Sequence, residues 1–249
     1  MKKKNKTMRA AGALFVATML TTSMTAGTFA KYTTTNSASD SARVAKFGVE
    51  VQAEGTLFAK KYVNEENGNT PGTINLTVNS EENVVAPGTK NSHGLTFCVT
   101  GTPEVTTSID IQVNGIEEVY LRAGEYFDYT TGGNLTDKFV LEENYYPVKF
   151  TLTQDGNKLV DRGKLSDVQS ALQGLSSIYE PGTVLNSAVG TLNLTWEWDF
   201  NGEGVTDKAD TLLGNLAADS AKYGVGITEN ADYSLQESVS INISVTQVD

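Results

Sequence analysis

Apolar and polar residues alternate along much of this 249-residue chain with the period of two that is typical of β-strands. The longest unbroken alternation runs from Thr191 to Phe200, where every second residue is apolar and the series includes Trp196 and Trp198. Successive side chains of a strand point to opposite faces, so this run predicts a strand with one buried face. Similar runs cover residues 45–52, 74–78, 95–99, 105–113, 146–152 and 239–245.

Residues that favour turns lie between these runs. Gln154-Asp155-Gly156-Asn157 predicts a tight hairpin, because Asp-Gly supplies the positive φ that such a turn needs. Pro-Gly pairs predict further turns at 86–89 and 180–183. Seven or more strands with one apolar face each need a second sheet to cover them. The sequence therefore predicts an all-β fold, a two-sheet, jelly-roll-like sandwich.

Two segments have helical spacing instead. Ser166–Leu175 places Val168, Leu172 and Leu175 on one face, with Ser166 and Gln169 as a capping box. Asp207–Ala218 repeats the pattern with alanines and leucines. We expect two short helices in the connections of the sandwich.

The first thirty residues read as a secretory signal peptide. Five basic residues precede an apolar stretch from Ala10 to Leu20, and cleavage is expected between Ala30 and Lys31. No cysteine follows the apolar stretch for lipidation, and the closing residues SVTQVD form no apolar tail. We therefore expect a secreted protein, in the extracellular matrix or at the cell surface, that touches a membrane only through the signal peptide before a signal peptidase removes it.

Charge and composition exclude several function classes. The chain carries a formal net charge of −11. Removal of residues 1–30 takes away five positive charges and no negative ones, which leaves 14 Lys and Arg against 30 Asp and Glu and a net charge of −16. Such an acidic protein is not expected to bind nucleic acid. One cysteine and one histidine also exclude structural zinc sites of the Cys₄ and Cys₂His₂ types.

Residues 31–42, KYTTTNSASDSA, form an arm that becomes a free N-terminus only after cleavage. The arm is rich in Thr and Ser and lacks Gly and Pro, and Tyr32 is its one large side chain. Two interpretations remain open: a disordered linker, or a donor strand that adds to an exposed sheet edge. The residues expected to lead such a strand are Lys31, Tyr32, Thr33, Thr34, Thr35 and Asn36.

Three segments together resemble the TasA/camelysin family of secreted Gram-positive proteins. They are the leader junction AGTFAKYTTTNSASDSARVAKFGVEV, the segment VAPGTKNS at 85–92, and LTWEWDFNGEGVTDKADTLLG at 194–214 followed by the closing ISVTQVD. The resemblance implies cleavage by a W-type signal peptidase and a jelly-roll domain, here residues 43–249. It also implies that the chain is its own partner and polymerises outside the cell into biofilm matrix fibres, and it favours donor-strand exchange of the arm.

An alternative function is a monomeric cell-surface or carbohydrate-binding module. Aromatic residues expected in loops suit such a role, because carbohydrate sites use aromatic faces. Strand packing is the other interpretation of the same residues. They are Tyr120, Tyr126, Phe127 and Tyr129.

A third alternative, a camelysin-like secreted protease, lacks a recognisable catalytic set in the sequence. A zinc protease of the His-Glu-x-x-His type needs two histidines, whereas His93 is the only one and is expected in a turn. Cys98 has no second histidine to activate it and alternates with core residues. We therefore expect a protein that is not an enzyme.

One acidic segment has the spacing of a calcium-binding loop. From Asp199 to Asp210, oxygen-bearing side chains occupy positions 1, 3, 5, 9 and 12, with a glycine at position 6. Several positions depart from the motif: Asp210 replaces the usual glutamate, and a strand precedes the loop. The alternative is a turn followed by a capped helix, so no cofactor is expected beyond possible calcium. The candidate ligands are Asp199, Asn201, Glu203, Asp207 and Asp210.

Overall fold

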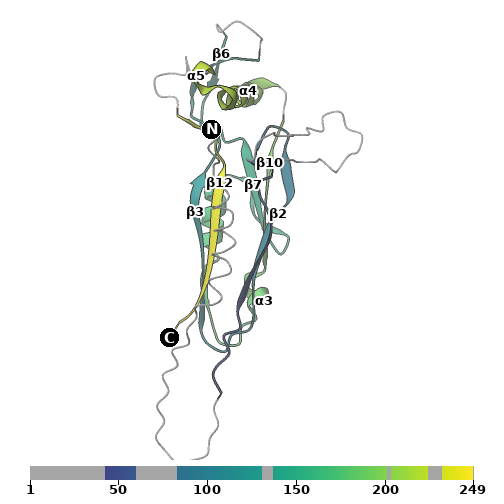
Figure 1. The fold of residues 1–249 in the computed structure, drawn as a ribbon, viewed down its shortest axis with the longest axis vertical. Helices are drawn as coiled ribbons and strands as arrows, with labels where there is room; N and C mark the ends of the chain where they lie inside the picture. The colour runs from purple at the N-terminus through teal and green to yellow at the C-terminus, as the bar shows by residue number, and fades with distance from the viewer. Residues whose placement is uncertain (1–42, 60–82, 131–136, 201–202, 224–231, 249) are drawn as a thin grey trace, which may run out of the picture.

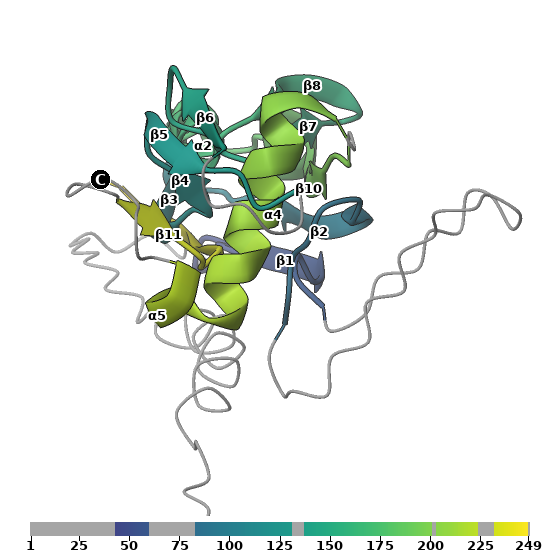
Figure 2. The same cartoon turned by 90° about the horizontal axis from the view of Figure 1, so that it is seen from above.

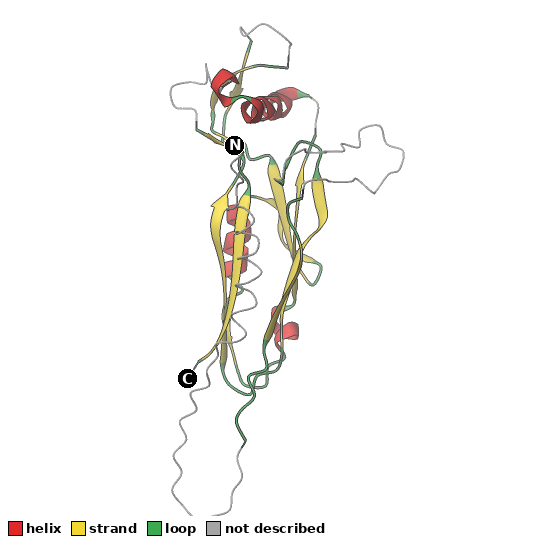
Figure 3. Ribbon diagram, viewed as in Figure 1, coloured by secondary structure: helices red, strands yellow, loops and turns green. Residues whose placement is uncertain are grey.

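The structure is a computed structural model that describes residues 43–59, 83–130, 137–200, 203–223 and 232–248. In this part of the chain the fold is mostly β, with several antiparallel sheets and a few short helices. The molecule is elongated, and its longest strands run along the same axis (Figures 1 and 3).

The larger sheet has five strands in the spatial order β1-β2-β10-β7-β8, and neighbouring strands are antiparallel. The predicted alternation is confirmed in its central strand, where Leu192, Leu194, Trp196 and Trp198 are all buried. Phe200 was expected to continue this face but is 63% exposed, because the strand ends at Trp198. The bounds of the strands are β1 Glu50–Gly55, β2 Lys90–Thr100, β10 Thr191–Trp198, β7 Val148–Gln154 and β8 Asn157–Gly163.

A second sheet has the order β12-β3-β9, with β12 at Ser238–Gln247, β3 at Thr107–Glu117 and β9 at Ser177–Tyr179. The buried side chains of this sheet belong to the same hydrophobic cluster as those of the larger sheet. Helix α2, Leu165–Gln173, contacts β3, β7 and β8 and so connects the two sheets along one side.

Local sequence signals explain the hairpin between β7 and β8. Asp155 and Gly156 have φ values of 50° and 80°, the left-handed backbone that Asp-Gly was predicted to supply. The predicted capping box of the following helix is wrong in its residues. The helix begins at Leu165, one residue earlier than expected, and the backbone N–H of Lys164 donates to Asp167 Oδ2 at 2.8 Å.

Most of the short elements gather at one end of the molecule, which we call the cap end. Helix α4, Gly204–Ala218, lies across this end, as Figure 2 shows from above. Helices α2 and α4 confirm the two predicted helices, whereas α3 and α5 were not predicted. The remaining elements are α5 Ser220–Tyr223, β4 Tyr120–Leu121, β5 Gly124–Phe127, β6 Lys138–Leu141 and β11 Tyr233–Ser234 at the cap end, and α3 Leu185–Val189 near the other end (Figure 1).

The opposite end, which we call the arm end, holds residues 43–49 and the connection between β2 and β3 (Figure 1). Ala45, Phe47 and Val49 are half-buried and the residues between them are exposed, although regular strand begins only at Glu50. The predicted strand at 74–78 lies outside the described residues. None of the described helices is both long enough and apolar enough to cross a membrane.

Candidate functional site

The cleavage site and the leading residues of the arm lie outside the described residues. These are Ala30 and Lys31 at the expected junction, and the candidate donor-strand residues Lys31–Asn36. What the structure describes is the place from which the arm leaves, beginning at Arg43.

Residues 43–46 follow the arm in sequence, and we call them the base of the arm. A cluster of polar contacts holds this segment at the arm end. The two terminal guanidinium nitrogens of Arg43, Nη1 and Nη2, donate to the carboxylate of Glu104 at 2.6 Å. The backbone N–H of Lys46 donates to the same carboxylate at 2.9 Å, and the N–H of Glu104 returns a hydrogen bond to Lys46 O at 2.8 Å. These donors, Arg43 first, lower the pKa of Glu104 to about 2, so the carboxylate stays ionised.

Close backbone packing fixes the same segment against the end of β2. Gly101 has a φ of 122°, and a Cβ placed on it would lie 2.3 Å from Gly48 O. Only glycine allows this approach without displacing the chain. Residues 43–48 are therefore fixed at the end of the molecule opposite the cap.

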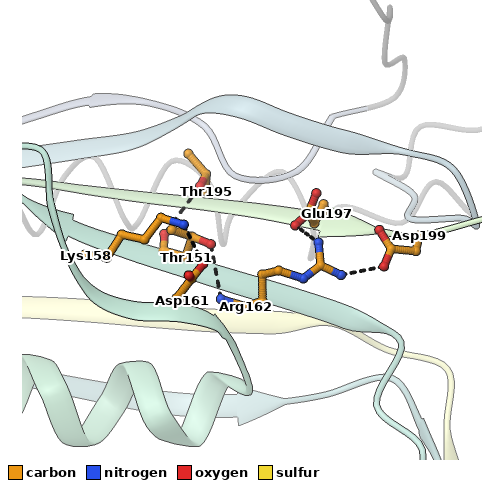
Figure 4. Close-up of polar contacts among 7 residues, drawn as sticks. All are labelled: Thr151, Lys158, Asp161, Arg162, Thr195, Glu197 and Asp199. Atoms are coloured by element: carbon orange, nitrogen blue, oxygen red, sulfur yellow. Dashed lines mark hydrogen bonds and ion pairs between the residues drawn. The ribbon is translucent and has the colours of Figure 1, made fainter.

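The candidate calcium ligands that the structure describes are engaged in different contacts. Asp199 follows β10 and pairs with Arg162 of β8, which also pairs with Glu197 (Figure 4). Glu203 is exposed at the start of α4, and Asp207 lies in the first turn of that helix. Asn201 lies outside the described residues.

Asp210 is buried between α4 and the sheet. Its Oδ1 accepts a hydrogen bond from the Tyr145 hydroxyl at 2.8 Å and another from Trp198 Nε1 at 3.0 Å. Burial raises the pKa of Asp210 to about 6, although both hydrogen bonds oppose that shift. These contacts attach α4 to the end of β10, a role that the calcium spacing did not indicate.

Among the described residues, no group of three or more His, Cys, Asp or Glu side chains is arranged to hold a metal ion. The loop between Asp199 and Glu203 includes the undescribed residues 201–202, so the calcium site stays a prediction.

The aromatic residues proposed for a binding surface pack within the cap end. Tyr126 is buried, stacks on Phe139 and donates its hydroxyl hydrogen to Arg122 O. Tyr120 stacks on Tyr146 with ring centroids 5.6 Å apart. Tyr129 meets Tyr223 edge to face, and Lys138 Nζ lies over the Phe127 ring. Packing accounts for the contacts of all four residues.

The two residues considered for catalysis lie on the same strand. His93 is exposed within β2 and not in a turn, which corrects the sequence expectation. Cys98 is half-buried on β2, and burial together with Glu50 and Glu54 raises the pKa of its thiol. A raised pKa keeps the thiol protonated and therefore poorly nucleophilic.

The sequence analysis missed Glu237, a half-buried residue immediately before β12 whose carboxyl group is buried. Glu237 Oε2 accepts the N–H of Val119 at 2.9 Å, whereas Oε1 has no hydrogen-bond partner within the described part of the chain. Burial raises the pKa of Glu237 to about 8, and the nearby Glu118 adds to the shift. No local pattern marks this residue, because its surroundings come from segments more than 100 positions away.

An open pocket of about 340 Å³ lies between the connection from β6 to β7 and the start of α2. Its lining includes Tyr145, Tyr146, Lys149 and Lys164, and Lys164 Nζ lies 4.4 Å from the centre of the Tyr146 ring. Burial, followed by the charges of Lys164 and Arg162, lowers the pKa of Lys149.

Compared with protein families, with curated proteins and with solved structures, the chain shows no match.

Proposed function

We propose that the chain is a secreted structural subunit whose two sheets form a jelly-roll-like sandwich and whose freed arm joins subunits into extracellular matrix fibres by donor-strand exchange. One observation carries the proposal: the base of the arm is fixed at one end of an elongated molecule, by Arg43, Glu104 and the Gly101 contact. The resemblance of three sequence segments to the TasA/camelysin family supports it.

This geometry favours an open polymer over a closed ring. An arm that leaves one end of a subunit and binds elsewhere on the next joins unlike surfaces, and a repeated head-to-tail contact produces a filament unless the rotation closes. Extended peptides bind sheet edges through main-chain hydrogen bonds, so the Thr- and Ser-rich arm needs few large side chains.

Cleavage of the leader acts as the assembly switch. Before cleavage, an apolar stretch and five positive charges precede the arm and tether it to the membrane. After cleavage, Lys31 is the free end of the arm, which then reaches a second copy.

Electron microscopy of the mature protein beginning at Lys31 tests the proposal. A variant that lacks Lys31–Asp40 serves as the comparison. We expect filaments from the mature chain. The shortened chain should remain a folded monomer. Its far-ultraviolet circular dichroism should differ from that of the mature chain only by the contribution of the arm. The peptide KYTTTNSASD should bind the shortened chain and block filament growth by the intact one. Filaments from the shortened chain would contradict strand donation.

A monomeric binding module is the second candidate, and the pocket beside Tyr146 is the observation that favours it. Its lining combines the Tyr146 ring with two lysines and two glutamates, Glu142 and Glu143, a mixture that suits a ligand with an apolar face and several hydroxyl groups, such as a sugar. Mature protein that stays monomeric at high concentration, across pH and salt, while binding an oligosaccharide would support this function over fibre formation.

A further inference from the structure

The four outer strands of the two large sheets differ in how well they are protected against further pairing. Edge strands are commonly protected by charges, irregularities or short length. β1 carries Glu50 and Glu54, β8 carries Lys158, Asp161 and Arg162 and has two register shifts, and β9 is only three residues long. β12, with the sequence SVSINISVTQ, has ten residues without a charge, a glycine or a proline.

The register shows which backbone groups of β12 face away from its neighbour. The N–H of Ile111 in β3 donates to Ser176 Oγ at 2.9 Å, on the side opposite β12. Backbone groups of successive residues alternate between the two sides of a strand, so the next residues of β3, Asp110 and Gln112, face β12. Their partners Ser244 and Asn242 face β3 in return.

The N–H and C=O groups of the intervening residues of β12 therefore point to its open side. Within the described part of the chain, no hydrogen bond joins these groups to another residue. Ile241 and Ile243 have side chains in the core, at 3% and 8% exposure, so the open backbone lies directly beside the hydrophobic core. The residues are Ile241, Ile243, Val245 and Gln247.

The side of β3 that faces away from β12 is covered. β9 pairs with β3 at Thr107–Ile109, and beyond it Gln169 Nε2 of α2 donates to Val113 O at 3.2 Å while Ser176 accepts from Ile111. Side chains thus satisfy backbone groups on that side, whereas the β12 side has no such cover among the described residues.

We propose that the open edge of β12 is the acceptor site for the arm of a second copy, an inference that rests on the proposed function. The arm has twelve residues against ten in β12, and both segments lack glycine and proline. The arm carries one lysine and one aspartate, so its residues 31–42 are neutral apart from the terminus. An uncharged edge suits it better than β1, whose glutamates would repel Asp40.

The two ends of the molecule also set the direction of pairing. β12 begins near the cap and ends at the arm end, where Val248 N–H donates to Thr106 O at 3.0 Å (Figure 1). When the arm end of one subunit meets the cap end of the next, Ala42 lies near the start of the acceptor strand and Lys31 lies near its end. The arm therefore runs antiparallel to β12.

Disulfide trapping tests both the site and the direction, since paired residues of adjacent strands lie about 4.5 to 5.5 Å apart, within the Cα range of a disulfide. In mature protein with Cys98→Ser, Ser39→Cys is combined with Ser240→Cys, Thr246→Cys or, as a matched control on the exposed edge strand β1, Gln52→Cys. After oxidation, we expect Ser240→Cys to give a ladder of disulfide-linked subunits. The amount of linked protein should be at least tenfold greater than with either of the other two positions.

Each other result overturns the inference. A dominant ladder with Gln52→Cys moves the acceptor to β1 while leaving strand donation intact, and one with Thr246→Cys reverses the direction. Dimers from Ser240→Cys without the arm cysteine show that β12 pairs with another β12. Filaments without any ladder place the acceptor elsewhere, whereas the absence of filaments from cysteine-free mature protein refutes the proposed function as well.

A second variant keeps the test independent of cysteine chemistry. Val245→Pro removes a backbone N–H that faces the open side, so the pairing with β3 is retained, as proline on an edge strand allows. In the protein that lacks Lys31–Asp40, we expect this change to weaken binding of KYTTTNSASD at least tenfold while the melting temperature shows that the protein is folded. Unchanged binding by the folded variant would overturn the proposal.

Discussion

Replacing Glu237, whose carboxyl group is buried, by glutamine should make the folded protein more stable at neutral and basic pH. The carboxyl has one hydrogen bond, to Val119 N–H, and its other oxygen has no partner within the described residues. Because burial raises its pKa from 4.5 to about 8, the folded chain holds a proton there that the unfolded chain releases at lower pH. Glutamine is neutral at every pH and keeps an oxygen for Val119.

The sign and size of this stability difference follow from the linkage between protonation and folding. A raised pKa means that the unfolded state binds fewer protons between the two pKa values, so the free energy of unfolding falls as pH rises through this window. Each pKa unit corresponds to about 1.4 kcal/mol, which gives a loss of about 3 to 4 kcal/mol between about pH 5 and pH 8 from this group alone. Asp210, with a pKa of about 6, acts in the same direction. The comparison of wild type with Glu237→Gln removes that common contribution.

Urea denaturation of the two proteins at about pH 5 and pH 8 measures the difference, with the exposed Glu125→Gln as a matched control. The free energy of unfolding of Glu237→Gln, measured relative to that of wild type, should be about 3 kcal/mol higher at about pH 8 than at about pH 5. Glu125→Gln should change by less than about 1 kcal/mol at both, as surface ion pairs do. A stability difference between wild type and Glu237→Gln that stays constant with pH would refute the buried, protonated carboxyl.

Two further predictions concern the core and the acidic loop. Trp196→Ala should lower the free energy of unfolding by about 3 to 5 kcal/mol, because the ring is buried and its Nε1 donates to Leu57 O at 2.7 Å. Chemical denaturation measures this loss, and a value below about 1 kcal/mol would mean that the residue does not lie in the core. If the loop binds calcium, calcium should raise the melting temperature of the wild type, and Asp199→Ala or Asp210→Ala should each abolish that rise; identical melting in calcium and in chelator would show that the loop is only a turn.

Alternation was sufficient to predict the strands that lie in the centre of the fold. Trp196 and Trp198 are buried as expected, and Asp-Gly forms the hairpin at 155–156. The end of such a strand is harder to predict. Phe200 continues the apolar pattern, but the chain leaves the sheet after Trp198 and turns toward α4, so the side chain is exposed.

Features that depend on pairing between distant segments could not be predicted. Alternation identifies the buried face of β12, but nothing in SVSINISVTQ tells whether one or both of its edges are paired. The short strands of the cap end have the same difficulty, because β4 is held by β11 more than 100 residues later. Asp210 fits a metal ligand in sequence, whereas its two donors come from Tyr145 and Trp198.

The anchoring of the arm also determines how a subunit would bear tension. A pull on Arg43 away from the arm end acts first on its contacts with Glu104 and then on β1, whose six residues pair with β2 from Glu50 and Thr100 to Gly55 and Leu95. The force runs along the strand, and the ladder hydrogen bonds lie across it. They are therefore loaded together in shear and do not open one at a time. The mechanical strength of a fibre built in this way would depend on the length of β1 as well as on the joint between subunits.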